Sequence, residues 1–107
     1  MLLGSQTPIL VDFYATWCGP CQLMSNVIQE VAANFPKEER LQVVKIDIDK
    51  YPALATRLRV QALPTLMLFR GGKQLDRVEG LLDAKMLSQR LRYYLRGLDA
   101  KFGRSQR

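Results

Sequence analysis

Two cysteines separated by two residues stand where an apolar strand pattern changes to a helical one, and this junction constrains the fold more than any other feature. Residues Ile9–Tyr14 are apolar except for Asp12, as expected of a buried strand. From Cys18 onward, the apolar residues recur at helical spacing, at Cys21, Met24, Val27, Ile28, Val31, Ala32 and Phe35. The chain is therefore expected to pass from a buried strand into a helix that begins at the first cysteine.

This position favours a reactive pair of thiols. A helix N-terminus offers unpaired backbone N–H groups and the positive end of the helix dipole, and both stabilise an anion. A cysteine placed there, or in a Cys-x-x-Cys pair, has a pKa lowered from about 8.5 to roughly 3.5–7.5. A purely structural disulfide between Cys18 and Cys21 would contribute little, because the stabilisation by a disulfide grows with the length of the loop that it closes. The pair is therefore predicted to be redox-active.

Length and composition favour one ordinary globular domain over residues 1–107. The chain has 48% hydrophobic and 24% charged residues, and 107 residues can bury one core but not two. No apolar run approaches the ~20 residues needed to span a bilayer, so no membrane attachment is expected. The opening Met1–Gly4 lacks a basic stretch followed by a long apolar one, and is not expected to act as a secretory signal.

The remaining pattern predicts a small α/β fold. Strands are expected at Leu41–Ile48, Thr65–Phe69 and Gln74–Glu79, the last two joined by a turn at Arg70–Lys73. A short helix is expected over Asp49–Val60. A final helix is expected after Asp83 as N-cap, with a buried stripe at Leu87, Leu91, Tyr94, Leu95 and Leu98. This order gives a mixed four-stranded sheet with one parallel pairing, flanked by helices on both faces.

Several short motifs stand along the chain in a characteristic order, namely Val11-Asp12-Phe13, Trp17–Cys21, Val44–Asp47, Leu63-Pro64-Thr65, Leu66–Phe69, Gly71-Gly72 and Gly80. With these residues, the chain resembles the thioredoxin family from Ile9 to the last predicted helix. The resemblance implies a thioredoxin-like fold and a thiol–disulfide oxidoreductase that reduces protein disulfides. It implies no cofactor beyond the reversible Cys18–Cys21 disulfide. The implied partners are disulfide-containing target proteins and thioredoxin reductase or an equivalent electron donor.

The resemblance also implies roles for single residues. Cys18 would attack a substrate disulfide as a thiolate, and Cys21 would resolve the mixed disulfide. Asp12 would accept a proton through a water, since burial should raise its pKa. Lys45 resembles the lysine that pairs with this aspartate in the family.

Further residues are implied in redox tuning and substrate binding. Gly19 and Pro20 resemble the insert that makes the family reducing. The substrate-binding residues would be Trp17 as an apolar rim, Leu63 through its backbone, Pro64 as a cis-proline, and Gly80 by leaving room for the substrate chain.

Taken singly, each of these residues has a simpler interpretation. Asp12 could be a buried polar residue with only a structural role, and Lys45 a surface lysine whose stem lies along the sheet. Trp17 could belong to the core, and Gly80 could serve only a turn. Leu63-Pro64 could be trans, because only about 5–6% of X–Pro bonds in folded proteins are cis.

The chain departs from the family at its N-terminus. Thioredoxins normally have a strand and a helix before the segment that matches Ile9–Tyr14, and only Met1–Pro8 precede it here, so the domain is expected to be N-terminally truncated. The strand Leu41–Ile48 would then lack its outer neighbour, and an uncovered edge invites pairing with another chain. We expect this edge to be exposed, covered by the N-terminal residues, or used to form a homodimer.

Other functions remain as alternatives. The first is a thioredoxin-fold interaction or assembly module in which the dithiol is secondary. A disulfide-forming oxidase would usually need an oxidising compartment, which nothing in the sequence indicates. A zinc site is disfavoured because the chain has no histidine and no cysteine besides Cys18 and Cys21, so a second subunit would have to complete four ligands.

The net charge of +6 says less about function. It could steer the protein toward acidic partners, or toward nucleic acid or a membrane surface. A solvated basic helix face is the favoured interpretation, because no aromatic platform or nucleic-acid motif accompanies the charge. No nucleic-acid partner is therefore expected. The expected location is the cytoplasm, with the plastid stroma as the alternative.

Overall fold

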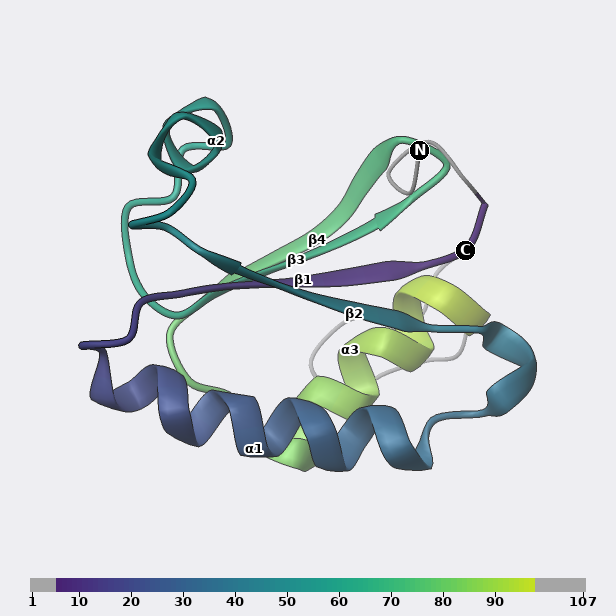
Figure 1. The fold of residues 1–107 in the computed structure, drawn as a ribbon. Helices are drawn as coiled ribbons and strands as arrows, with labels where there is room; N and C mark the ends of the chain where they lie inside the picture. Colours follow the sequence, from purple (N-terminus) through teal and green to yellow (C-terminus); the bar gives the residue numbers. More distant parts are fainter. Residues whose placement is uncertain (1–5, 98–107) are drawn as a thin grey trace.

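Four strands form one mixed sheet in the computed structural model, which describes residues 6–97 (Figure 1). The strands are β1 (Ile9–Tyr14), β2 (Gln42–Asp47), β3 (Thr65–Arg70) and β4 (Lys73–Glu79), and their order in the sheet is β2-β1-β3-β4. β1 pairs with β2 in parallel and with β3 antiparallel, and β3 pairs antiparallel with β4. The predicted mixed four-stranded sheet is confirmed.

Three α-helices and one short 3₁₀ helix accompany the strands within residues 6–97. They are α1 (Gly19–Asn34), the 3₁₀ helix η2 (Lys37–Glu39), α2 (Pro52–Arg57) and α3 (Ala84–Arg96). α2 is shorter than the predicted helix over 49–60. Its first residue is a proline, and its last turn is followed by a residue in the left-handed conformation, which ends the helix.

The helices α1 and α3 cover one face of the sheet (Figure 1). The main core is formed there by the apolar stripes of both helices and the strand residues that point toward them, namely Leu10, Met24, Ile28, Val31, Phe35, Leu66, Leu68, Leu82, Leu87, Leu91 and Leu95. The Asp83 carboxylate accepts the N–H of Met86 at 2.8 Å, so the predicted N-cap of the last helix is confirmed. Leu98, predicted in the same stripe, lies outside the described residues.

The opposite face is covered by α2 and the segment that follows it. Its core consists of alternate residues of β1 and β3, namely Ile9, Val11, Phe13, Met67 and Phe69, against which Leu58, Val60 and Leu63 pack. Helices therefore lie on both faces, as predicted. β1 ends where α1 begins, and α2 lies at this same end of the molecule (Figure 1).

β2 is an edge strand of the sheet. Within residues 6–97, no strand pairs with its outer side, and Gln42, Val43 and Lys45 are exposed. The predicted open edge is present in this part of the chain. Of the N-terminal residues Met1–Pro8, which could cover this edge, the first five lie outside the described range.

None of the helices between residues 6 and 97 combines the length and the apolar character that a membrane-spanning helix requires.

Candidate active site

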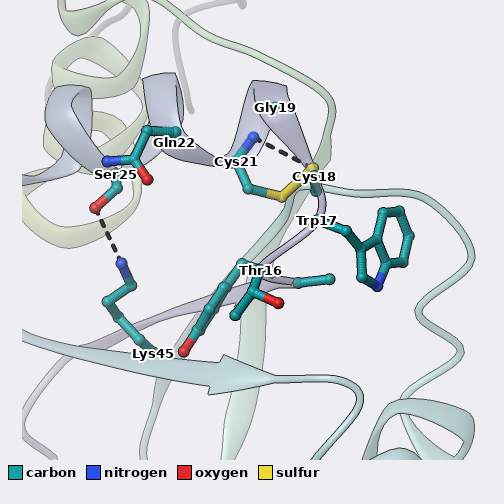
Figure 2. A pocket seen from close by; sticks show the side chains of 10 residues that line it. Thr16, Trp17, Cys18, Gly19, Cys21, Gln22, Ser25 and Lys45 are labelled. Atoms are coloured by element: carbon teal, nitrogen blue, oxygen red, sulfur yellow. Dashed lines mark hydrogen bonds between the residues drawn. A yellow bond between two sulfur atoms is a disulfide. The ribbon is translucent and has the colours of Figure 1, made fainter.

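The cysteine pair lies at the start of α1 and is joined in a disulfide (Figure 2). The two Cα atoms are 5.4 Å apart, and Cys18 is the N-cap residue of the helix. The backbone N–H of Cys21 donates to Cys18 Sγ at 3.2 Å, and Pro20 lies in the first turn, where its missing N–H costs nothing. The first cysteine therefore stands at the positive end of a helix of 16 residues, where a thiolate is stabilised.

The two sulfur positions differ in their exposure. Cys18 is partly exposed, and Gly19 and Pro20 beside it are exposed, whereas Cys21 retains only 4% of its accessible surface. An incoming disulfide can therefore reach Cys18 from solvent, while Cys21 is shielded by the protein. This is the asymmetry that an attacking and a resolving thiol require.

A pocket of about 320 Å³ opens beside the disulfide on the side of β2 (Figure 2). Both cysteines, Tyr14, Ser25 and Lys45 contribute to its walls. The pocket therefore joins the resolving cysteine to a lysine on the neighbouring strand.

Asp12, in the middle of β1, is buried, with 1% of its surface exposed. Neither of its carboxylate oxygens has a hydrogen-bond partner in the described structure. Burial raises the pKa of Asp12 from 3.8 to about 6, and the positive charge of Lys45 lowers it in part. The carboxyl group therefore changes its charge close to neutral pH, as a proton acceptor must.

The expected ion pair between Lys45 and Asp12 is not formed. The two residues are partners in the register of β1 and β2, but Lys45 Nζ donates to Ser25 Oγ at 3.0 Å. The ammonium group also lies 4.9 Å from the centre of the Tyr14 ring. Within residues 6–97, no salt bridge joins Lys45 to Asp12. Lys45 therefore acts on Asp12 through its charge rather than through a direct contact.

Trp17 lies on the surface before the cysteines rather than in the core. Its side chain is 69% exposed, and its indole Nε1 donates to Asp49 Oδ2 at 2.9 Å. The backbone N–H of Asp49 in turn donates to the carboxylate of Asp47 at 2.9 Å. Asp49, which no sequence motif marks, therefore fixes the orientation of the exposed ring.

A second cavity, of about 490 Å³, lies on the other side of the disulfide. Its walls are formed by Trp17–Pro20 and by residues 60–63 together with Ile48. The peptide bond between Leu63 and Pro64 is cis, as the resemblance predicted. The Gly80 N–H donates to the Pro64 carbonyl at 2.9 Å, and the glycine has a φ of +92° with open space where a Cβ would stand.

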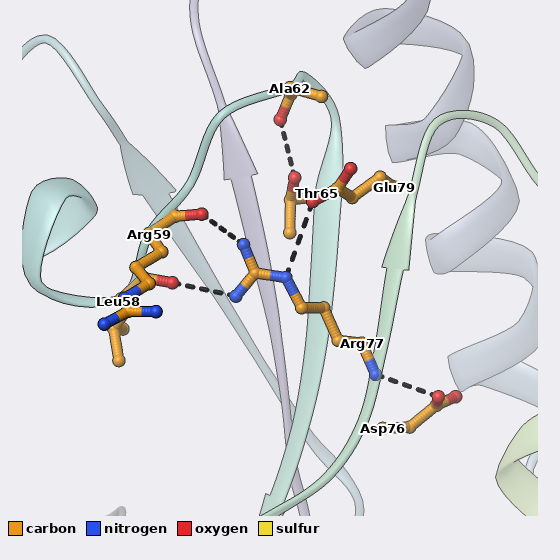
Figure 3. A network of polar contacts seen from close by, with 7 residues as sticks. All are labelled: Leu58, Arg59, Ala62, Thr65, Asp76, Arg77 and Glu79. Atoms are coloured by element: carbon orange, nitrogen blue, oxygen red, sulfur yellow. Dashed lines mark hydrogen bonds and ion pairs between the residues drawn. The ribbon is translucent and has the colours of Figure 1, made fainter.

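Arg77 was not singled out from the sequence, yet it makes an extensive polar network (Figure 3). From β4, its guanidinium donates to the carbonyl oxygens of Leu58 and Arg59, just beyond α2. Arg90 is also built into the structure, since it makes two hydrogen bonds of 2.8 Å to Asp76. Two of the basic residues, Arg77 and Arg90, therefore have structural roles and do not simply form a solvated basic face.

Among residues 6–97, no three His, Cys, Asp or Glu side chains are grouped so that they could hold a metal ion.

Comparison with known proteins points to one family. The thioredoxin family model matches residues 1–93. The thioredoxin-like protein slr0233 of Synechocystis is 50% identical over 95 residues, which cover 89% of each chain. Thioredoxin Y1, chloroplastic, of Arabidopsis thaliana is 50% identical over 91 residues, which cover 85% of this chain and 52% of that protein. The chain thus spans about half the length of this chloroplastic relative.

Solved structures agree with these sequences. A mutant thioredoxin from Halobacterium salinarum superimposes with a TM-score of 0.75 at 39% identity, covering 84% of this chain and 76% of that one. Chloroplastic thioredoxin z superimposes with a TM-score of 0.70 at 40% identity, covering 80% and 76%. The interaction-module alternative is not favoured, because the cysteine pair of the family is present and within disulfide distance. The chain belongs to the thioredoxin family and is a thiol–disulfide oxidoreductase of the protein-disulfide reductase type.

Proposed function

We propose that Cys18 is the attacking thiol, Cys21 the resolving thiol and Asp12 the proton acceptor in the reduction of protein disulfides. The observation that carries this assignment is the asymmetric Cys18–Cys21 pair at the start of α1, with an unpaired buried carboxylate beneath the same helix.

In the first step, the Cys18 thiolate attacks one sulfur of a substrate disulfide. The substrate S–S bond breaks, a mixed disulfide forms on Cys18, and the other substrate sulfur leaves as a thiolate that takes a proton from water. The helix N-terminus supports this step because it stabilises the thiolate at pH values where a free cysteine is largely protonated.

In the second step, Cys21 attacks Cys18 Sγ and releases the second substrate thiol. The Cys18–Cys21 disulfide is then formed, and two electrons have passed to the substrate. Cys21 is buried and must lose its proton before it attacks. Asp12 is suited to accept that proton through a water, since burial raises its pKa to about 6.

Lys45 tunes this acceptor in our proposal, because its charge lowers the pKa of Asp12 and keeps part of the carboxyl population ionised. Gly19 and Pro20 lie exposed in the first turn and set the reduction potential of the pair. Gly19 has no side chain and Pro20 has a compact ring, so neither shields Cys18 from a substrate.

The cavity between Trp17 and residues 60–63 is proposed to bind an extended segment of the target protein. Trp17 would supply apolar contact area and Leu63 would offer its backbone groups, while cis-Pro64 would shape the wall. Gly80 would leave space for the substrate chain, since in the described part of the chain nothing lies within 4 Å of the position of a Cβ there.

The electron donor is proposed to be thioredoxin reductase or an equivalent enzyme that reduces the Cys18–Cys21 disulfide. The proposed location is the cytoplasm or the plastid stroma. Relatives from a cyanobacterium and from a chloroplast support this placement.

The open edge of β2 is proposed to support homodimer formation. Val43 is 36% exposed there, and the edge backbone groups offer hydrogen bonds to a second strand. Sedimentation over a wide concentration range should detect the dimer. A monomer at every concentration would contradict it.

Reduction of insulin disulfides, with dithiothreitol as the electron source, tests the residue assignment. Wild type should turn over many equivalents, and Cys18→Ser should add nothing to the rate of dithiothreitol alone. Cys21→Ser should be slow, because its mixed disulfide is released only when dithiothreitol attacks it. Insulin reduction by Cys18→Ser at the wild-type rate would contradict the assignment.

A further inference from the structure

The chain reverses sharply after α2, and this reversal leads into the wall of the cavity beside the cysteines. The Arg59 N–H donates to the Thr56 carbonyl at 3.0 Å, and the Val60 N–H donates to the Ala55 carbonyl at 2.9 Å. These two bonds form a Schellman motif, in which the residue after the helix adopts a left-handed conformation and is usually glycine. Here that residue is Arg59, with a φ of 58°. An L-residue with a side chain adopts this conformation at an energetic cost.

Arg77, on strand β4, donates hydrogen bonds to the backbone of this reversal (Figure 3). Its Nη1 donates to the Leu58 carbonyl at 2.8 Å, and its Nη2 donates to the Arg59 carbonyl. Its Nε lies 3.5 Å from a carboxylate oxygen of Glu79. Because Arg77 pairs with Met67 in the β3–β4 register, its side chain leaves the sheet on the face that α2 covers. A positive charge is thereby placed at the end of α2, where the helix carbonyls are unpaired.

Residues 60–63 run directly from this reversal and line the cavity that contains Cys18. At the far end of the segment, Thr65 Oγ1 donates to the Ala62 carbonyl at 2.5 Å (Figure 3). The wall is therefore fixed at two points, by Arg77 before it and by Thr65 after it. Neither Arg77 nor Thr65 lines the cavity itself.

We propose that Arg77 is a positioning residue for protein substrates, which clamps the left-handed turn at Arg59 and so holds the wall 60–63 in its binding position. This inference rests on the proposed binding of target proteins in that cavity. Arg77 would act from β4 without touching the substrate or the cysteines. An extended substrate needs the wall, whereas a small disulfide needs only access to Cys18. Loss of the clamp should therefore affect KM for a protein substrate selectively.

The test compares insulin with hydroxyethyl disulfide as substrates of Arg77→Gln. The KM for insulin should rise about ten-fold, the equivalent of one charge-assisted hydrogen bond, while the rate with hydroxyethyl disulfide should change far less. Adding Arg59→Gly should recover most of the loss, because glycine adopts the left-handed turn without the clamp. Arg77→Lys keeps the positive charge but cannot donate in the bidentate geometry of a guanidinium. Its KM for insulin should therefore lie between those of wild type and Arg77→Gln.

Arg90→Gln is the matched control, since it removes an arginine with two hydrogen bonds on the α3 face of the sheet. It should leave the ratio of the two substrate rates unchanged. An unchanged KM for insulin in Arg77→Gln would overturn the proposal. The proposal would also fail if Arg77→Gln and Arg90→Gln each lost the same fraction of activity with insulin as with hydroxyethyl disulfide. It would fail as well if adding Arg59→Gly to Arg77→Gln did not lower the KM for insulin. If wild type reduced hydroxyethyl disulfide but not insulin, the proposed protein-binding function would fail instead.

Discussion

Lys45 faces Asp12 across the parallel pairing of β1 and β2, but its ammonium group donates to Ser25 Oγ, 3.0 Å away, instead of pairing with the carboxylate. Ser25 lies four residues after Cys21 on α1 and is itself buried. The hydroxyl group therefore holds the lysine over the pocket of the resolving cysteine. Among the described residues, Asp12 has no direct hydrogen-bond partner, and burial keeps its pKa raised.

Replacement of the buried carboxylate should stabilise the protein. Since burial raises the pKa of Asp12 from 3.8 to about 6, the folded state binds this proton more tightly than the unfolded state. The contribution of this tighter proton binding to the free energy of unfolding is fully present below about pH 4 and is lost as the pH rises through about 6. Asp12→Asn should therefore stabilise the oxidised protein at about pH 7 by about 3 kcal/mol, since each pKa unit corresponds to about 1.4 kcal/mol.

Urea unfolding of wild type and Asp12→Asn at acidic and neutral pH measures this effect. The difference in unfolding free energy between the two proteins should be small at low pH and large at neutral pH. A constant difference across this range would show that Asp12 titrates normally.

Loss of the neighbouring positive charge should move the same titration upward. Lys45 lowers the pKa of Asp12, so Lys45→Gln should raise that pKa above about 6. Carbon NMR of the side-chain carboxyl group against pH measures the midpoint. Lys73→Gln, at the start of β4, serves as a control that removes an equal charge elsewhere. A midpoint that stays in place or falls in Lys45→Gln argues against electrostatic coupling.

The two thiols should ionise at different pH values in the reduced protein. Cys18 stands at the helix N-terminus, and its pKa should lie below the ordinary value of about 8.5. Cys21 is 4% exposed, and burial should keep its pKa higher than that of Cys18. Thiolate absorbance against pH in Cys21→Ser and in Cys18→Ser reports each thiol alone. The reverse order would exclude Cys18 as the activated thiol.

Adding a single methyl group at Gly80 should lower the free energy of unfolding, because the backbone there has a positive φ. Its φ is +92°, and no atom of residues 6–97 lies within 4 Å of the position of a Cβ, so strain comes from conformation rather than from a clash. Gly80→Ala should therefore cost about 1–2 kcal/mol of unfolding free energy. Gly19 also has open space but begins α1 without a positive φ, so Gly19→Ala is the matched control and should have little effect. Equal unfolding free energies in urea for both variants would refute the backbone argument.

Most of the fold follows from local patterns in the sequence. The apolar run of β1, the helical stripe from Cys21 to Phe35 and the N-cap at Asp83 each specify an element through neighbouring residues, and each is present. The end of α2 was placed too late. A left-handed turn at an arginine has no signature in the sequence, where a glycine would have marked it.

The residues of the candidate site also differ in whether the local sequence predicts them. Cys18 and Cys21 are adjacent in a motif, so their position at a helix start follows from the sequence. Ser25, Asp49 and Arg77 were missed because their partners lie 18 to 32 residues away. Arg77 in addition bonds to backbone carbonyls, which every residue carries and which no pattern distinguishes.

Trapping of the mixed disulfide tests the central assignment most directly. Reduced Cys21→Ser and Cys18→Ser would each be mixed with a peptide that contains one disulfide, and the adducts would be measured by mass spectrometry under non-reducing conditions. Cys21→Ser should form a stable adduct on Cys18 rapidly, because the attacking thiol is intact and no second thiol releases the peptide. Cys18→Ser should form little adduct in the same time, because Cys21 is buried. Faster adduct formation on Cys21 than on Cys18 would contradict the account.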